Sequence, residues 1–195
     1  MSQANVVDWA LNKVAAQTNA NEICRWTNDA RNSSMIDWWA DYDEAKRNSN
    51  PLPAVPGWGP NLQLICHEFV LYAAYASNQI SAEDITGYYS EFMKNGSKWG
   101  PTLNGYWFSS PTNYVSGSTS PKKGDIVIFD DPGHVAIATG ETTGSGHSKI
   151  VGLWGLTDQN AGQPCPITVD SIEALSAFLK EQGAPGKPQF SSAPW

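Results

Sequence analysis

The chain has 195 residues, 41% of them hydrophobic, and a formal net charge of −7 at pH 7. A chain of this length is expected to form one domain with a sizeable core. The negative charge argues against nucleic acid or an anionic membrane as a partner, and it allows a basic partner such as an inhibitor protein. No run of residues approaches the length of a transmembrane helix, so membrane insertion is not expected.

Cysteine and histidine positions limit the redox and metal chemistry of the chain. The three cysteines, Cys24, Cys66 and Cys165, include no C-x-x-C pair, and their odd number argues against a disulfide scaffold. The cysteines and the three histidines lack the spacing of zinc ligands, and no glycine-rich phosphate loop is present. Neither a metal nor an organic cofactor is therefore expected.

The first fifty residues have helical patterns. Residues 5–17 and 34–46 each carry apolar side chains at helical spacing. A weaker helical pattern covers residues 22–30 and includes Cys24, which we interpret as a structural residue. Residues 48–60 contain four prolines and two glycines, and this composition predicts a linker.

Residues 60–80 predict a helix that is apolar around most of its circumference, which is typical of a central core helix. Cys66 lies in the first turn, near the positive end of the helix dipole, which favours thiolate over thiol. Cys66 is therefore either a nucleophile or a small core residue. A nucleophile would need a base from elsewhere in the chain.

A further helix is predicted over residues 81–94, where Ser81 and Asp84 have the spacing of a capping box. Residues 96–120 are rich in glycine, serine, threonine, asparagine and aromatic residues without a clear period. We expect this segment to be a long loop, and loops of that length are often functional.

The pattern then changes to short β-type runs. The expected strands cover residues 125–129, 134–139, 149–154 and 167–169. A strong turn signal joins the first two, so we expect an antiparallel meander. A last helix is predicted over residues 171–182 with Asp170 as its cap, and residues 183–195 predict a tail that is mobile or laid on the surface.

His134 opens the second of these strands, directly after the turn. A histidine there lies at the edge of the sheet, and its ordinary pKa suits proton transfer near neutral pH. The same position also suits an edge residue without a chemical role. The residue alone therefore does not decide between the two.

The segment PKKGDIVIFDDPGHVAIATG, residues 121–140, resembles the NlpC/P60 group of papain-like cysteine enzymes. In that family a Pro-x-x-Gly-Asp turn leads into an apolar strand, and His-Val opens the next strand after a short turn. A cysteine that begins an apolar, alanine-rich helix precedes the histidine in both. The resemblance covers about residues 60–154.

The resemblance implies an α+β, papain-like fold in which the cysteine-bearing helix packs on a small antiparallel sheet, with extra N-terminal helices. We therefore expect a single domain over residues 1–195. Within it, residues 1–50 would form the N-terminal helical part, residues 60–182 the catalytic core and residues 183–195 the tail.

By position in the family, Cys66 is the implied nucleophile, His134 the general base, and a thioacyl group on Cys66 the intermediate. A third, orienting residue is expected on the strand after the histidine, but Gly152 stands at its usual position. The remaining candidates are His147, Asp158, Gln159 and Asn160. We favour Asp158 because a carboxylate best stabilises an imidazolium.

The implied activity is that of a cysteine hydrolase, an amidase or peptidase acting on a peptidoglycan peptide or a host protein, or a related deamidation or acyl transfer. CHEFVLYAAY also resembles papain-like domains of bacterial toxins, so an effector with an immunity protein as partner is expected. No secretory signal is visible, which predicts synthesis in the cytoplasm and export by a signal-independent system. The alternative is a catalytically inactive papain-like module that binds through an aromatic cleft.

Overall fold

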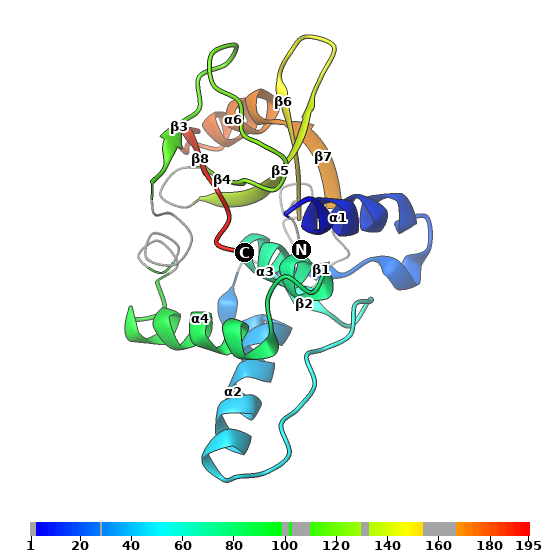
Figure 1. The fold of residues 1–195 in the computed structure, drawn as a ribbon, viewed down its shortest axis with the longest axis vertical. Coiled ribbons are helices and arrows are strands. Elements are labelled where there is room, and N and C mark those ends of the chain that lie inside the picture. The colour runs from blue at the N-terminus through cyan, green and yellow to red at the C-terminus, as the bar shows by residue number, and fades with distance from the viewer. Residues whose placement is uncertain (1–2, 28, 99–101, 103–109, 130–132, 154–166) are drawn as a thin grey trace.

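A computed structural model describes residues 3–27, 29–98, 102, 110–129, 133–153 and 167–195 of the chain (Figure 1). Its helices are α1 (Ala4–Ala16), α2 (Ser34–Arg47), α3 (Cys66–Ala76), α4 (Ala82–Lys94) and α6 (Ile172–Glu181), with 3₁₀ turns η1 (Ala20–Glu22) and η2 (Ala30–Asn32). Its strands are β1 (Arg25–Trp26), β2 (Gln63–Leu64), β3 (Thr112–Asn113), β4 (Ile126–Phe129), β5 (His134–Thr142), β6 (Ser148–Leu153), β7 (Ile167–Ser171) and β8 (Pro188–Ser191).

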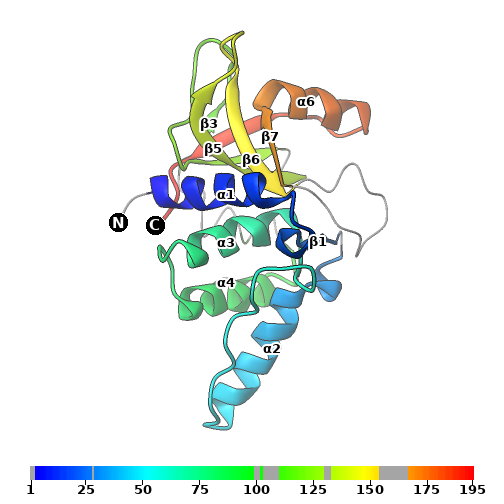
Figure 2. The same cartoon turned by 90° about the vertical axis from the view of Figure 1, so that its right-hand side faces the viewer.

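A six-stranded antiparallel sheet in the order β3-β8-β4-β5-β6-β7 forms the central layer. Strands β4 to β7 follow one another in chain order, so the predicted meander is confirmed. Helices α1 and α3 cover one face of this sheet, and α6 covers the other, as Figure 2 shows. The combination of helices with an antiparallel sheet confirms the α+β class.

Side chains alternate along β5 and divide the core in two. Val135 and Ile137 point to the face that α3 covers and join a large apolar cluster with that helix. Ala136 and Ala138 point to the opposite face and join a smaller cluster with α6. Strand β4, the first six residues of β5 and most of β6 are buried on both faces for this reason, which explains why these runs are almost continuously apolar.

Helix α3 is buried from His67 to Ala74 without interruption. It lies between the sheet and α4, with α1 beside it (Figure 2), which explains why it lacks a polar face. The prediction that the helix extends from Pro60 is wrong, because Gln63 and Leu64 form β2 and the helix begins at Cys66. Cys66 is therefore the first residue of the helix.

The weaker helix predicted over residues 22–30 does not form in the described residues 23–27. Its place is taken by β1, which pairs in parallel with β2. The N–H of Arg25 donates to the carbonyl of Leu62 at 2.8 Å, and the N–H of Thr27 donates to that of Leu64 at 2.9 Å. Pairing with a distant segment overrides a weak local preference here. Cys24 is buried, in agreement with a structural role.

The C-terminal segment is not a mobile or surface-laid tail. Its strand β8 inserts between β3 and β4, and Phe190 pairs with Val127. Without β8, the inner strand β4 would present unpaired backbone groups along one edge of the sheet. The segment was difficult to recognise because its partner strand lies about sixty residues away in the sequence.

The cap of α4 is the one that the sequence predicts, whereas the cap of α6 is a different residue. Ser81 and Asp84 form the predicted capping box of α4, with Asp84 accepting from the N–H of Ser81 at 2.8 Å. Asp170, however, is not the cap of α6. Ser171 fills that position and accepts a hydrogen bond from the N–H of Ala174 at 3.1 Å. Asp170 remains part of β7.

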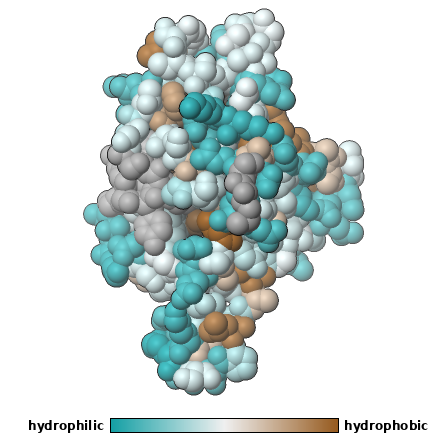
Figure 3. Space-filling view, in the orientation of Figure 1, coloured by the Kyte–Doolittle hydropathy of each residue, from teal (hydrophilic) through white to brown (hydrophobic). Residues whose placement is uncertain are grey.

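On one face of the molecule and among the described residues, exposed hydrophobic side chains lie in separate places (Figure 3). On the face in Figure 3, brown patches are divided by hydrophilic residues. The large exposed hydrophobic residues within the described ranges are Leu52, Met93, Val115 and Val169, which lie on different parts of the chain. In the part of the chain that the structure describes, no helix has the length and apolar character needed to cross a membrane.

Candidate active site

The start of α3 holds Cys66 in a defined position. Ile65, the residue before it, donates its N–H to the carboxylate of Glu68 at 3.0 Å. The first N–H groups of a helix have no partner within the helix and form the positive end of its dipole. Cys66 is half-buried, and as the first residue of the helix it lies beside these amides.

Glu68 is buried and connects three helices. Its carboxylate accepts hydrogen bonds from the hydroxyl of Ser33 at 2.6 Å and from the hydroxyl of Tyr89. Ser33 caps α2 and Tyr89 belongs to α4, so the carboxylate joins both helices to the turn that bears Cys66. Burial raises the pKa of the Glu68 carboxyl to about 7, although these hydrogen bonds by themselves would lower it.

The thiol of Cys66 faces the beginning of β5. Burial raises its pKa to about 11, while the backbone N–H groups of Val135 and His67 lie close enough to oppose that rise. The nitrogen of Val135 belongs to the peptide bond that joins it to His134. The fold therefore brings the predicted nucleophile against the backbone of the predicted base.

His134 is the first residue of β5 and is paired with Phe129, whose ring centroid lies 6.3 Å from that of the imidazole. The side chain is buried, and this burial lowers its pKa to about 4. Its Nε2 lies 3.7 Å from the point that a Cβ on Gly152 would occupy. The imidazole is therefore neutral near pH 7 and extends over a residue without a side chain.

His67 also belongs to this cluster. Adjacent residues of a helix point about 100° apart, which predicts a poor contact between Cys66 and His67. The structure nevertheless places Nδ1 of His67 3.9 Å from Sγ of Cys66. The pKa of His67 lies well below its ordinary value because of its burial and because His134 is nearby. One neutral imidazole, that of His67, thus lies beside the thiol, and a second, that of His134, lies near the first.

The predicted orienting residues fall into two groups. Asp158, Gln159 and Asn160 lie outside the described residues, so the choice of Asp158 stays a prediction. His147 lies at the opposite end of β6 from Gly152, with its Nδ1 4.0 Å from the carboxylate of Glu173 and 3.5 Å from the hydroxyl of Ser145. The structure therefore does not bring His147 to His134.

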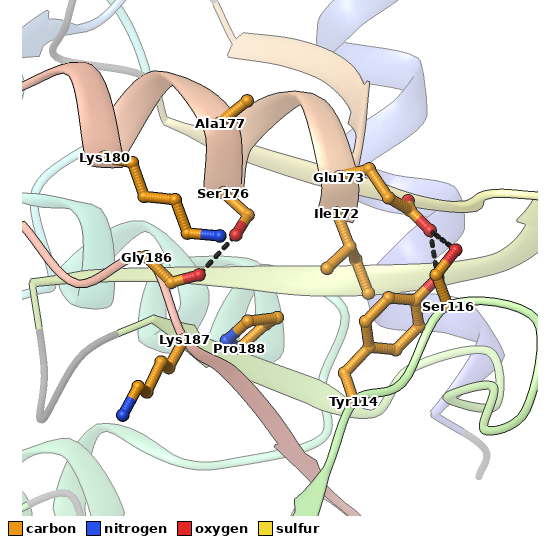
Figure 4. Close-up of a pocket in the computed structure, with 10 residues that line it drawn as sticks. All are labelled: Tyr114, Ser116, Ile172, Glu173, Ser176, Ala177, Lys180, Gly186, Lys187 and Pro188. Atoms are coloured by element: carbon orange, nitrogen blue, oxygen red, sulfur yellow. Dashed lines mark hydrogen bonds between the residues drawn. The ribbon is translucent and has the colours of Figure 1, made fainter.

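A pocket of about 420 Å³ lies elsewhere, between α6 and β8 (Figure 4). Its polar groups bond to one another: Glu173 accepts from the hydroxyls of Tyr114 at 2.7 Å and Ser116 at 2.5 Å, and Ser176 donates to the carbonyl of Gly186. Neither Cys66 nor His134 lines it. This pocket therefore has no part in the candidate active site.

Sequence reasoning missed Glu68, and it treated His67 as too poorly oriented to serve as a base for Cys66. A signal for Glu68 was present, because a glutamate three residues after the residue that precedes a helix can accept that residue's N–H. The signal for His67 was its position in the first helical turn beside Cys66. Neither signal shows which distant helices complete the network.

A thiol beside helix-terminal amides, with a neutral imidazole at the start of the facing strand, suits nucleophilic attack on a carbonyl group. Comparison with protein families agrees with this chemistry. The family model of the CHAP domain matches residues 55–152, which is half of the chain and includes Cys66 and His134. The chain belongs to the CHAP domain family.

The CHAP domain is a cysteine- and histidine-dependent amidohydrolase or peptidase domain related to the NlpC/P60 superfamily. The resemblance drawn from residues 121–140 is thereby confirmed. The family makes the protein a hydrolase of the amidase or peptidase class, whose members act on peptide or peptidoglycan substrates. No curated protein and no solved structure matches the chain.

Proposed function

We propose that this CHAP domain is a cysteine amidase or peptidase in which Cys66 is the nucleophile and His134 the general base. The proximity of the Cys66 thiol to the N–H of Val135, the residue bonded to His134, carries the proposal. The packing of α3 on the antiparallel sheet supports a papain-like fold of the NlpC/P60 type.

The reaction follows from this arrangement. His134 takes the thiol proton as the sulfur of Cys66 attacks the substrate carbonyl, and helix-terminal N–H groups stabilise the oxyanion. The imidazolium returns the proton to the leaving nitrogen, the carbon–nitrogen bond breaks, and a thioester remains on Cys66. His134 then removes a proton from water, which attacks the thioester and releases a carboxylic acid and the thiol.

Before substrate binds, Cys66 is an uncharged thiol and His134 is a neutral imidazole. The pKa of the thiol is raised to about 11 and that of His134 is lowered to about 4, and burial is the main cause of both shifts. Separate charges are therefore costly before the substrate binds, although an adjacent thiolate and imidazolium stabilise each other. Proton transfer is expected to accompany attack on the carbonyl.

We propose the stem peptide of peptidoglycan as the substrate. The support is the CHAP family, whose amidases act on peptide or peptidoglycan substrates. A role as an effector toxin, with an immunity protein as partner and export from the cytoplasm, is a further proposal that goes with a wall substrate. The net charge of −7 leaves room for a basic partner.

Digestion of purified peptidoglycan tests the proposal directly. The wild-type protein is expected to release fragments with new free amino groups, identified by mass spectrometry. Cys66→Ser and His134→Gln are each expected to abolish this release while the far-UV circular dichroism is retained. Cys24→Ala is the matched control, because Cys24 is a buried core cysteine to which no catalytic role is assigned, and it is expected to remain active.

Expression in a test bacterium separates wall from protein substrates. Lysis on delivery to the periplasm, with no harm from the cytosol, is the expected result. Harm from the cytosol alone would exclude peptidoglycan as the main target. Full activity of the Cys66→Ser variant on any substrate would overturn the catalytic assignment itself.

A further inference from the structure

Gly152 opens a space beside His134 that another strand can fill. On the antiparallel sheet, directly paired residues point to the same face. Gly152 pairs with Thr168 of β7, and Ile150 pairs with Asp170. Thr168 and Asp170 therefore point to the same face as His134, and no side chain on Gly152 separates them from it.

The structure contains a small cavity at this place. His134, Gly152, Thr168 and Asp170 line it, together with apolar residues of the sheet and of α6. Its volume is about 10 Å³, which is close to the smallest space that holds one water molecule. Three of the lining residues, His134, Thr168 and Asp170, have polar side chains, and buried waters commonly make about three hydrogen bonds.

The side chain of Asp170 has no capping or bonding role among the described residues. Ser171 caps α6 in its place. Within the described ranges the carboxylate of Asp170 makes no hydrogen bond or ion pair, although it is half-buried and its burial raises its pKa. Because burial disfavours the charged form of this carboxyl, a cation or a donor facing it would stabilise that form. His134 becomes a cation each time it takes the proton of Cys66.

We propose that Asp170 is the positioning residue of His134, acting across Gly152 through one water molecule that Thr168 also binds. The proposal rests on His134 being the general base. The Nε2–H of His134 donates toward this water, which leaves Nδ1 as the nitrogen that takes the thiol proton. The carboxylate then stabilises the imidazolium. The orienting group thus comes from β7, one strand beyond the position where Gly152 stands.

The ionisable groups near His134 come from two elements. On α3, Cys66 lies beside the N–H of Val135 and His67 interacts electrostatically with His134, and on β7 Asp170 lines the same cavity as His134. His67 is neutral near pH 7, and Glu173 of α6 bonds to Tyr114 and Ser116 outside the cavity. Within the described part of the chain, Asp170 is therefore the carboxylate that lines the cavity beside the imidazole.

The test compares Asp170→Asn with the wild-type protein in peptidoglycan digestion at several pH values. Loss of the carboxylate is expected to lower kcat about 10- to 100-fold with little change in KM, as for other residues that orient a functional histidine. The acid limb of kcat/KM is expected to move to lower pH, because the imidazolium loses its partner. Thr168→Val is expected to lower kcat by a smaller factor, and Asp170→Glu to restore part of the activity.

The Tm of Asp170→Asn distinguishes a positioning role of Asp170 from a structural role. Asp170→Asn removes a half-buried charge without a described partner, so its Tm is expected to equal or exceed that of the wild type. Glu141→Gln makes the same charge change on an exposed residue of β5 and is expected to leave kcat and the pH profile unchanged.

Three results would overturn the proposal. The first is a wild-type kcat and pH profile in Asp170→Asn, and the second is a loss of activity in that variant explained by a lower Tm. The third is that the lowered kcat and the shifted pH profile appear in Asp158→Asn instead of in Asp170→Asn. Failure of the dyad is a separate outcome. It would appear as activity retained in His134→Gln, whereas failure of the positioning role leaves His134→Gln inactive and Asp170→Asn unaffected.

Discussion

Sγ of Cys66 lies 3.9 Å from Nδ1 of His67, its neighbour at the start of α3. This distance is at the outer limit for a hydrogen bond to sulfur. The site therefore offers two imidazoles, and their roles can be separated. His67 is held on the same helix turn as the thiol, whereas His134 belongs to the strand whose Val135 N–H lies beside that thiol.

We expect His134→Gln to lower kcat about 100- to 10,000-fold, the range that a general base contributes. His67→Gln should lower kcat less than about tenfold, because the loss of one modest hydrogen bond corresponds to about 1 kcal/mol. Steady-state kinetics of both variants on the same peptide substrate measures the difference. Equal losses would show that the two histidines act together.

The raised pKa of Cys66 predicts how its alkylation depends on pH. In His134→Gln the thiolate forms only by ionisation of a thiol with a pKa of about 11, so labelling by iodoacetamide should rise about tenfold per pH unit between pH 7 and pH 10. In the wild type, proton transfer to His134 adds a reactive fraction near pH 7, and the rise should be shallower. Mass spectrometry of the labelled peptide gives both rates.

Cys24 serves as the internal reference, because it is buried. Wild-type Cys66 should be alkylated much faster than Cys24 near pH 7. Identical pH profiles for Cys66 in the wild type and in His134→Gln would exclude an acid–base link between these residues.

The pKa of Glu68, raised from 4.5 to about 7, predicts a pH-dependent contribution to stability. Between these values the folded protein binds more protons at this site than the unfolded chain does. The free energy of unfolding should therefore fall as pH rises from about 4.5 to 7, by roughly 3 kcal/mol from this group. Glu68→Gln should lack this component.

Urea unfolding of both proteins across this pH range measures the difference. The buried imidazoles of His67 and His134, whose pKa values are lowered, act in the opposite direction. They are present in both proteins and cancel to first order in the comparison. Parallel stability curves for the wild type and Glu68→Gln would contradict the assignment.

Strand β8 predicts a backbone effect at Gln189. Gln189→Pro removes an N–H within the strand and is expected to lower the free energy of unfolding by about 2 kcal/mol. Gln189→Ala keeps that N–H and loses only the exposed side-chain bond to Asn113, so its effect should stay within about 0.5 kcal/mol. Thermal or urea unfolding shows whether the two variants differ.

Local sequence patterns were sufficient to predict the helix that contains Cys66 and the strand that contains His134. The apolar helix with Cys66 and the Gly-Asp strand followed by His134 are encoded within about twenty residues each, so their types were predicted correctly. Strands β1 and β8 are short and take their conformation from distant partners, which no local pattern shows.

The wider site was less accessible to sequence reasoning for the same reason. The contacts of Glu68 come from α2 and α4, and the neighbours of His134 depend on the register between β6 and β7. Asp170 was predicted as a helix cap because a capping residue and a strand residue with an inward carboxylate look alike at a strand–helix junction. The pairing of Asp170 with Ile150, two residues before Gly152, shows that Asp170 lies on the same face of the sheet as Gly152.

The packing between Gly152 and Ala136 also limits how this enzyme can change by mutation. A Cβ on residue 152 would stand 3.2 Å from the Cβ of Ala136, which is tighter than ordinary contact. A polar side chain at residue 152 is therefore unfavourable alone and becomes acceptable after Ala136→Gly. The two positions are epistatic, so a library that varies one residue at a time would miss a direct partner for His134, whereas one that varies both together could select it.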